Sequence, residues 1–377
     1  MTKLVIFKEK AGETRVALVP ADVQKLLGLG YQISVEAGAG ELASFNDDSY
    51  RKVGAEIVEG DALQQAKASA DVLVRIQKPS LEDLDGLRED ALHLSFLDPF
   101  KEKELLQAFA KGHIKAVSLE MIPRTTLAQK MDVLSSQTSL AGYAAVILAA
   151  SKMPQIFPMM MTPSGNISPV RVFVIGVGVA GLQVIATAKR LGARVEAFDT
   201  RVAVEEQVKS LGARFLKIDL GEDAEDAKGY ASELTPEQIK KQQDAQAKVC
   251  AKSDLVITTA KVFGRQAPIL LTEEMLAAMK PGSLVIDMAV ATGGNVVGSD
   301  PEREIITENG VRIIGADQLE RLVPLDASNM FSGNIRAFLE HFTDSETKEL
   351  QLPLDEKILR ECLITTGGEI VHERFKN

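Results

Sequence analysis

Short apolar runs alternate with helical patterns of polar and apolar residues along almost the whole chain. The runs before residue 120 predict strands at Leu4–Phe7, Ile33–Glu36, Val72–Ile76, His93–Phe96 and Ala116–Leu119. Helical patterns fall between them, for example at Pro20–Leu29 and Lys101–Lys111. Buried strands that alternate with helices are typical of parallel α/β sheets, so this part of the chain predicts a complete doubly wound domain.

A second series of strands follows a long apolar helix, expected from about Ser136 to Lys152, and a proline-rich connector at 153–169. Its predicted strands are Val172–Ile175, Val195–Phe198, Arg214–Ile218, Leu255–Thr259, Leu284–Met288 and Val311–Ile314. The fold class is therefore α/β with two doubly wound parallel-sheet domains, the second a Rossmann dinucleotide-binding domain. We expect an N-terminal domain at 1–138 and the Rossmann domain at 139–328, with 329–377, which has helical patterns, returning to pack on the first.

The first strand-to-helix turn of the second series carries the glycine pattern of a dinucleotide site. Gly176 allows a tight turn, Gly178 has no side chain to block a pyrophosphate, and Gly181 lets the helix lie close to the strand. The start of that helix, with Val179 and Ala180, offers unpaired N–H groups to phosphate. The same glycines also occur as a structural turn in unrelated α/β proteins, which is the alternative interpretation.

The next strand ends in Asp199, 18 residues beyond Gly181, where a carboxylate accepts hydrogen bonds from the adenosine ribose hydroxyls. Such a carboxylate repels a 2′-phosphate, so NAD(H) is favoured over NADP(H). Thr200 and Arg201 follow in the same loop and complete the expected cofactor-binding set. Arg201 is either a solvated surface charge, which we favour, or a group that accommodates a 2′-phosphate.

The connection between the strands predicted at 214–218 and 255–259 is longer than is usual in α/β units. We expect a polar helix to begin near Pro236, and an acidic stretch without an apolar period before it. A segment of this kind is either a lid or an insert without regular structure. Tyr230 is its obvious anchor, either contacting the nucleotide or lying in solvent as an ordinary loop tyrosine.

Composition narrows the classes of function. The 377 residues include 53 acidic and 43 basic residues and no Lys/Arg-rich run, so a nucleic-acid partner is not expected. Only Cys250 and Cys362 occur, far apart, which indicates no disulfide framework and no metal site and fits a reducing compartment. The longest apolar stretch, Leu140–Ala150, is shorter than the roughly 20 residues of a membrane span. We therefore expect no transmembrane segment in this chain.

Longer stretches carry a resemblance to a known superfamily. ETRVALVP at 13–20 and SSQTSLAGY at 135–143, together with the glycine turn, resemble alanine dehydrogenase and the NAD(H)-binding subunit of proton-translocating transhydrogenase. PRTTLAQKMDVLSSQ at 123–137 and AFDTRVAVEEQVKSLGA at 197–213 are most similar to the transhydrogenase subunit. Val202 departs from the family, which usually has proline there, and this puts only local loop rigidity in doubt.

The resemblance implies a loop that contacts the nicotinamide and its ribose. Arg124 would hold the carboxamide or phosphate region, and Asp132 would position that arginine. Gln129 would contact ribose hydroxyls and could bridge toward the second nucleotide, and Ser135 would bond to the carboxamide. Of these, we expect Arg124, Gln129 and Asp132 to serve catalysis. From the residues alone, the segment is a helix N-cap with scattered polar residues. The family's mobile loop, which closes over bound nucleotide, corresponds to the long connection described above.

The resemblance also implies the function. The chain would be a soluble subunit that binds NADH and delivers hydride to NADP⁺ on a partner subunit, coupled to proton translocation by a separate membrane-spanning subunit. A homodimer is implied, located in the cytoplasm and peripheral on the cytoplasmic face of the inner (plasma) membrane. Hydride exchange between two nicotinamides needs neither a nucleophile nor a proton donor, so positioning supplies the catalysis.

The alternative is an NAD-dependent alanine dehydrogenase, whose chemistry needs a proton carrier beside the reacting carbon. Of the four residues that this resemblance implies, the arginine is present as Arg15, whereas Gln77, Asp98 and Ala291 replace a lysine, a histidine and an aspartate. Lys78 would restore the lysine only if the alignment slips by one residue. Arg15 is then a structural ion-pair partner, which we favour, or a substrate ligand. A third possibility is an NAD-sensing module without catalysis.

Overall fold

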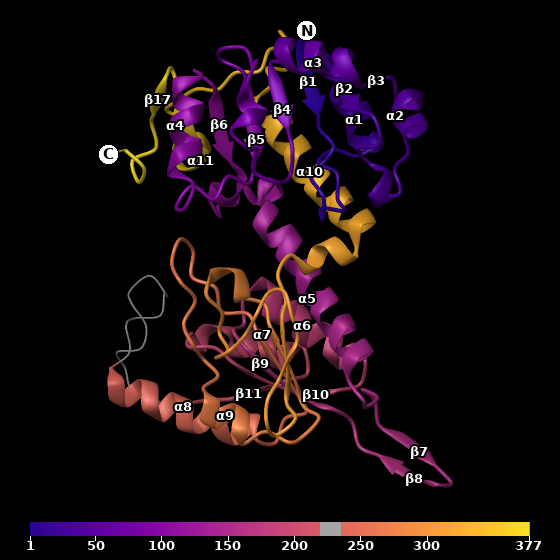
Figure 1. Ribbon diagram of the computed structural model, residues 1–377, viewed down its shortest axis with the longest axis vertical. Helices are drawn as coiled ribbons and strands as arrows, with labels where there is room; N and C mark the ends of the chain where they lie inside the picture. Colours follow the sequence, from indigo (N-terminus) through magenta and orange to yellow (C-terminus); the bar gives the residue numbers. More distant parts are fainter. Residues whose placement is uncertain (219–234, 377) are drawn as a thin grey trace. The chain divides into compact units, whose positions relative to one another are not determined.

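Each of the two predicted series of strands forms one mainly parallel sheet. The computed structural model describes residues 1–218 and 235–376, and the chain divides into two compact units (Figure 1). Unit 1 consists of residues 1–137 together with 320–377, and unit 2 of residues 138–319. The fold class expected from the sequence, two doubly wound α/β domains, is confirmed.

The sheet of unit 1 has the strand order β17-β16-β6-β5-β4-β1-β2-β3. Its strands are β1 (Thr2–Ile6), β2 (Tyr31–Glu36), β3 (Glu56–Val58), β4 (Val72–Val74), β5 (Leu92–Ser95), β6 (Lys115–Ser118), β16 (Leu363–Thr366) and β17 (Glu369–Ile370). The first six strands are parallel, and the sheet grows outward in both directions from the adjacent pair β1 and β4. The C-terminal β16 and β17 add antiparallel, where the sequence showed only helical patterns.

A helix from the end of the chain completes the core of unit 1. The helices are α1 (Pro20–Gly28), α2 (Asp47–Val53), α3 (Gly60–Ser69), α4 (Lys103–Lys111), α10 (Pro324–Phe342) and α11 (Lys357–Cys362). In α10, Phe331, Ile335 and Phe338 are fully buried in the same hydrophobic cluster as Leu4 and Ile6 of β1. Each such side chain contributes about 1.5–3 kcal/mol on burial, so packing holds α10 in this unit.

The sheet of unit 2 has the strand order β11-β10-β9-β12-β13-β15-β14. Its strands are β9 (Arg171–Ile175), β10 (Arg194–Phe198), β11 (Arg214–Phe215), β12 (Leu255–Thr258), β13 (Leu284–Asp287), β14 (Ile305–Ile306) and β15 (Arg312–Gly315). All of them pair in parallel except β14, which is antiparallel to β15. Numbered along the chain, the parallel strands have the Rossmann order 3-2-1-4-5-6.

Helices and a hairpin complete unit 2. The helices beside the sheet are α6 (Val179–Arg190), α7 (Glu205–Ser210), α8 (Pro236–Cys250) and α9 (Glu273–Ala277). Helix α8 begins at Pro236 as expected, and Thr235 caps it with a capping box. The proline-rich connector contains an unpredicted antiparallel hairpin, β7 (Met160–Thr162) and β8 (Gly165–Ile167).

Helix α5 (Val133–Lys152) contributes to both units and begins three residues before the predicted start. Among the described residues it is one helix long and apolar enough to cross a membrane by length and composition alone. A core helix meets the same criteria, and Ala145 and Ala149 of α5 are fully buried in the hydrophobic core of unit 2. The apolar character of α5 is therefore explained in part by packing.

Candidate functional site

Two of the three motif glycines in unit 2 are required by close packing, and the other borders open space. Gly176 has φ +96°, and a Cβ there would lie 2.7 Å from the hydroxyl oxygen of Thr259. A Cβ on Gly181 would lie 2.0 Å from the carbonyl oxygen of Gly176, so a side chain cannot fit between helix and turn. A Cβ on Gly178 would meet no described atom within 4 Å. The turn is thus open at the residue where a pyrophosphate would approach.

The first turn of α6 leaves its N–H groups available. Gly178 is the N-cap and supplies no capping side chain. Its carbonyl accepts the N–H of Leu182 at 2.9 Å, and the N–H groups of the first turn, including those of Val179 and Ala180, lack intrahelical acceptors. Gly142 of α5 packs against this turn, since a Cβ there would lie 2.4 Å from the carbonyl oxygen of Ala180. These N–H groups and the helix dipole favour an anion at the start of α6.

Asp199 follows β10 and lies directly beside the glycine turn. One oxygen of its carboxylate accepts the N–H of Val177 at 2.7 Å, and the other accepts the N–H of Arg201 at 2.9 Å. The guanidinium of Arg201 contacts both oxygens, with Nε at 3.0 Å and Nη2 at 3.1 Å. The preferred interpretation of Arg201 as a solvated surface charge is therefore wrong. The pairing arises because two residues in an extended turn, with Thr200 between them, place their side chains on the same side.

A buried polar network that the sequence analysis missed supports the turn. The carboxylate of Asp287, at the end of β13, accepts the N–H groups of Ala289 and Asn295 at 2.9 Å each. The amide of Asn295 donates to the carbonyl of Ala260 at 2.9 Å and accepts the N–H of that residue at 3.1 Å. Next to Ala260, the hydroxyl of Thr259 donates to the carbonyl of Gly176 at 2.9 Å. The network thus connects the ends of three parallel strands to the glycine turn.

In unit 1 the predicted nicotinamide loop leads into α5, and Asp132 caps that helix. Its carboxylate accepts the N–H of Ser135 at 2.9 Å and the hydroxyl proton of Ser135 at 2.6 Å. Arg124 is exposed, and its Nε lies 3.9 Å from the same carboxylate. Gln129 is also exposed, in a single 3₁₀ turn named η4 (Gln129–Met131). The structure therefore has both a helix cap and an aspartate beside an accessible arginine.

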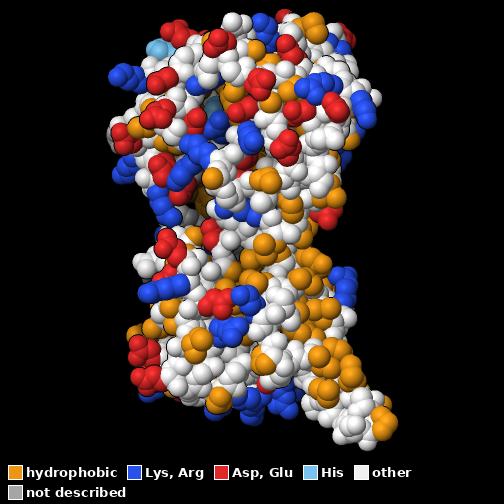
Figure 2. Space-filling view, turned by 45° about the vertical axis from the view of Figure 1, so that its right-hand side comes forward, with side chains coloured by type: hydrophobic (Ala, Val, Ile, Leu, Met, Phe, Trp, Pro, Cys, Tyr) orange, Lys and Arg blue, Asp and Glu red, His pale blue; other side chains and the backbone are white. Residues whose placement is uncertain are grey.

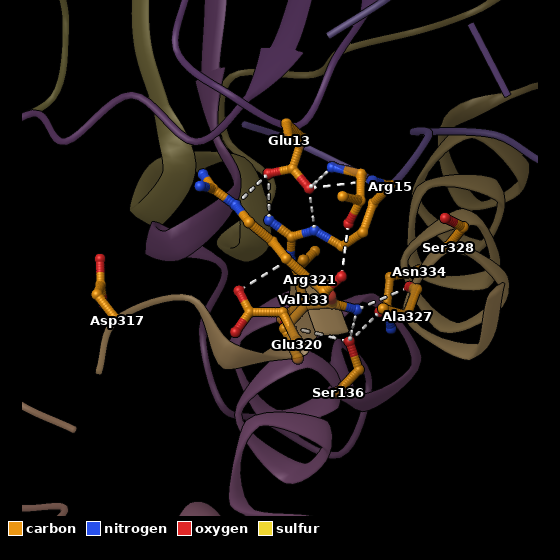
Figure 3. Close-up of polar contacts among 12 residues, drawn as sticks. Glu13, Arg15, Val133, Ser136, Asp317, Glu320, Arg321, Ala327, Ser328 and Asn334 are labelled. Carbon is orange, nitrogen blue, oxygen red and sulfur yellow. Dashed lines mark hydrogen bonds and ion pairs between the residues drawn. The ribbon is translucent and has the colours of Figure 1, made fainter. Parts of the chain in front are cut away.

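A buried ion-pair cluster, formed by Glu13, Arg15, Glu320 and Arg321, lies in unit 1 beside the start of α5 (Figure 3). Arg15 binds both oxygens of Glu13 at 2.7 Å, through Nε and Nη2. Its Nη1 donates to Glu320 at 2.9 Å and to the amide oxygen of Gln137 at 2.8 Å. Arg321 donates to Glu13 at 3.0 Å. Four of the five guanidinium protons of Arg15 are thus engaged, as expected of a structural ion-pair partner.

The charges of the cluster shift the pKa of its members. Burial alone would raise the pKa of Glu13, but hydrogen bonds and charge from Arg15, together with the charge of Arg321, hold it below its ordinary value. Burial would lower the pKa of Arg15, but the hydrogen bond to Glu13 and the charge of Glu320 outweigh burial and raise it. Both groups therefore stay ionised at neutral pH.

The positions implied by the alanine dehydrogenase alternative do not form a proton-transfer site. Lys78, one residue from the implied lysine position, forms an ion pair with Glu102 at 2.5 Å. Asp98, at the implied histidine position, lies 3.8 Å from the ammonium of Lys101. Ala291, at the implied aspartate position, has no group that could carry a proton. His93, the buried histidine of β5, has its pKa lowered to about 3 by burial and by the charge of Arg75.

The candidate residues fall into two sets, one in each unit. Unit 2 brings together Gly176, Gly178, Gly181, Asp199 and Arg201, and unit 1 brings together Arg124, Gln129, Asp132 and Ser135. Tyr230 lies outside the described residues. Within the described part of the chain, no group of three or more His, Cys, Asp or Glu residues could hold a metal ion.

The strand order of unit 2 and its glycine turn define a protein with a Rossmann-type dinucleotide-binding domain. Residues 5–141 and 145–373 match the models of the alanine dehydrogenase/PNT N-terminal and C-terminal domains. The chain belongs to this family and, within it, to the NAD(P) transhydrogenase alpha subunits.

Individual relatives support this placement. The chain is 44% identical to an NAD(P) transhydrogenase alpha subunit, the first of its two parts, from Rhodospirillum rubrum, over 98% of each chain. It is 38% identical to the solved transhydrogenase of Sinorhizobium meliloti, with a TM-score of 0.85 over 99% of both chains. Identity to alanine dehydrogenase of Mycolicibacterium smegmatis is 27%, over 78% of this chain and 73% of that protein. Alanine dehydrogenase is therefore a more distant relative.

Proposed function

We propose that this chain is the NAD(H)-binding subunit of a proton-translocating NAD(P) transhydrogenase, active only together with partner subunits. When bound, NADH supplies a hydride, which passes to NADP⁺ held on a partner subunit. The observation that carries the proposal is the glycine turn of unit 2, open at Gly178 and bordered by the Asp199 carboxylate. The transhydrogenase alpha subunits among the relatives favour this reaction over other uses of a Rossmann domain.

The residues of unit 2 fit a dinucleotide. The free N–H groups of the first turn of α6 would bind the pyrophosphate, because they and the helix dipole favour negative charge. Asp199 would accept hydrogen bonds from the adenosine ribose hydroxyls. Since Arg201 already binds both Asp199 oxygens, ribose binding has to share or displace that contact. Arg201 therefore moderates the negative charge that favours NAD(H) over NADP(H).

The residues of unit 1 would orient the nicotinamide end. Arg124 would hold the carboxamide or phosphate region, and Asp132, which lies within ion-pair distance, would restrict its position. Gln129 would contact the ribose, and Ser135, whose hydroxyl is bonded to Asp132, would contact the carboxamide. Tyr230 would contribute from the long connection. None of these residues needs to transfer a proton, because their task is to orient and to exclude water.

We also propose a homodimer that is peripheral on the cytoplasmic face of the inner membrane and contacts the NADP(H)-binding and membrane-spanning subunits. An apolar surface of unit 2 supports the dimer: hydrophobic side chains gather over the β7–β8 hairpin and α5 (Figure 2). Met161 is 72% exposed and Met159 59% exposed, and Tyr143 and Ile147 of α5 are also exposed. Apolar patches of this kind commonly mark protein–protein interfaces.

Reconstitution tests the reaction. Hydride transfer from NADPH to an NAD⁺ analogue with a distinct reduced spectrum is followed with membranes that carry the partner subunits, with and without this protein. We expect transfer only when protein and membranes are combined. A parallel cuvette contains the protein, NAD⁺ and alanine without membranes. Alanine-dependent NAD⁺ reduction there would overturn the proposal in favour of the dehydrogenase.

Cofactor preference tests the role of Asp199. Asp199→Asn removes the charge that repels a 2′-phosphate and releases Arg201, so NADH binding should weaken roughly tenfold while NADPH binding improves. Arg201→Gln is the matched control, because it removes the ion pair but keeps the carboxylate. That variant should retain the preference for NADH. The fluorescence of the reduced nucleotides reports both affinities, and an unchanged preference in Asp199→Asn would disprove the assignment.

A further inference from the structure

The side chain of Asn334, on α10, connects the two ends of the predicted nicotinamide loop. Its Nδ2 donates to the carbonyl oxygen of Lys130 in η4 at 2.7 Å. Its Oδ1 accepts the hydroxyl proton of Ser136, in the first turn of α5, at 2.7 Å (Figure 3). The orientation of this amide is determined by chemistry, because a carbonyl oxygen can only accept and therefore must face the Nδ2 group. One side chain thus sets the separation of residues 130 and 136.

Both contacts lie next to proposed site residues. Lys130 follows Gln129, and Ser136 follows Ser135. The 3₁₀ turn between them has few bonds of its own: the N–H of Met131 bonds to the carbonyl of Ala128 at 2.8 Å. A single turn of this kind has little intrinsic stability, so a bond from another helix determines where it lies.

A second contact between α10 and α5 supports the first. Gln137 is buried, and its amide nitrogen donates to the carbonyl of Ala327 in α10 at 3.0 Å. The oxygen of the same amide accepts from Arg15 at 2.8 Å, within the buried ion-pair cluster. The start of α5 is thus bound to α10 at two successive residues, Ser136 and Gln137. The alternative interpretation is that these bonds only stabilise the core of unit 1.

We propose that Asn334 is a positioning residue for hydride transfer, which holds Gln129 and Ser135 in the spacing that orients the nicotinamide. This inference rests on the proposed function. It predicts an effect on turnover that is larger than the effect on nucleotide affinity, because most of the affinity would come from the turn in unit 2. A small displacement of orienting groups reduces rate strongly even when binding is retained.

The test compares two asparagines of the same helix. Asn334→Ala removes both bonds, and Asn329→Ala removes an exposed side chain that lines the same 350 Å³ surface cavity without contacting the loop in this way. Ser136→Ala removes one of the two bonds and leaves the one to Lys130. Each variant is measured for turnover with partner membranes, for NADH affinity, for thermal unfolding, and for hydrogen exchange at the Met131 amide.

We expect Asn334→Ala to lower turnover roughly tenfold or more, with NADH affinity within about twofold and faster exchange at Met131. Asn329→Ala should behave like the unsubstituted protein. The effects of Asn334→Ala and Ser136→Ala should be non-additive in the double variant, because the two side chains share a bond. Faster exchange and non-additivity would distinguish positioning from a general loss of stability.

Three outcomes would overturn the inference. They are a turnover equal to that of Asn329→Ala, a parallel loss of NADH affinity and turnover, or unchanged exchange at Met131. Failure of the unsubstituted protein to transfer hydride would instead disprove the proposed function and remove the catalytic role of Asn334 with it. The two failures are therefore separate in the data.

Discussion

The two units have the same order of parallel strands but differ at the position where such sheets bind ligands. In each, the first strand lies beside the fourth, and ligands of open α/β sheets bind at this switch point. In unit 2 the glycine turn borders it. In unit 1 the loop after β1 carries Glu9, whose carboxylate accepts the N–H groups of Ile76 and Gln77 after β4, at 2.5 and 3.1 Å. The switch point of unit 1 is thus occupied by a side chain of its own.

The first helices of the two units differ in the same sense. Helix α6 follows Gly178 and has free N–H groups, whereas α1 begins with Pro20, which has no N–H. Asp22, in the first turn of α1, accepts the Ser332 hydroxyl proton and pairs with Arg336, each at 2.7 Å. A phosphate there would meet a carboxylate and the side chains of α10. Strand order alone therefore does not make a nucleotide site, because the first turn of the first helix decides it.

The largest effect should come from the buried ion-pair cluster of unit 1. Arg15→Met leaves the Glu13 carboxylate buried without its main partner, and we expect unfolding to be about 3–5 kcal/mol easier. The chain has no tryptophan, so circular dichroism during urea denaturation is the suitable measurement. In the double variant Glu13→Leu/Arg15→Met, much of the loss should be recovered. A stable single variant would mean that Arg15 is free for a ligand, as the dehydrogenase alternative requires.

A pH dependence should distinguish unit 1 next. Burial raises the pKa of Glu9 from 4.5 to about 7, against the opposing hydrogen bonds from Ile76 and Gln77 and the charge of Arg75. A raised pKa in the folded state means that the stabilising contribution is complete below pH 4.5 and is lost as pH rises to about 7. The loss is at most about 3 kcal/mol.

The variant Glu9→Gln checks this pH dependence, because an amide does not ionise. Its stability should be lower at acidic pH, where it loses one hydrogen bond, but should change less between pH 4.5 and 7. Urea denaturation at several pH values gives both slopes. Equal slopes for the variant and the unsubstituted protein would show that Glu9 is ionised throughout this range.

The same comparison shows what the sequence pattern could predict. The parallel strands that border the two switch points were predicted within a few residues, because buried β-branched runs and glycine spacing are local signals. The strands β3, β14 and β17, which have two or three residues each, are too short to show a pattern. Asn334 and Ser332 lie about 200 to 300 residues from their partners, and no local signal marks such contacts.

The glycine turn allows a smaller but sharper test. Gly181→Ala places a methyl group 2.0 Å from the carbonyl of Gly176, so we expect a loss of about 1–3 kcal/mol in stability and of NADH binding. Gly178→Ala is the matched control, since a Cβ there meets no described atom within 4 Å. Its stability should change by less than about 0.5 kcal/mol, while NADH affinity falls because the methyl group occupies the approach of the pyrophosphate. Unchanged NADH affinity in Gly178→Ala would place the nucleotide elsewhere.

The smallest effect on stability should come from Asp132, where the helix-cap and functional interpretations separate. Asparagine caps helices as well as aspartate, so Asp132→Asn should keep the bond to the Ser135 N–H and change stability little, whereas Asp132→Ala should cost about 1 kcal/mol. The asparagine variant loses only the charge that faces Arg124, and a pair with so exposed an arginine contributes little to folding. If Asp132 orients Arg124, turnover with partner membranes falls in both variants. If turnover falls only in Asp132→Ala, in proportion to the loss of helix stability, Asp132 is a cap and the accessible side of the loop is defined by Arg124 and Gln129 alone.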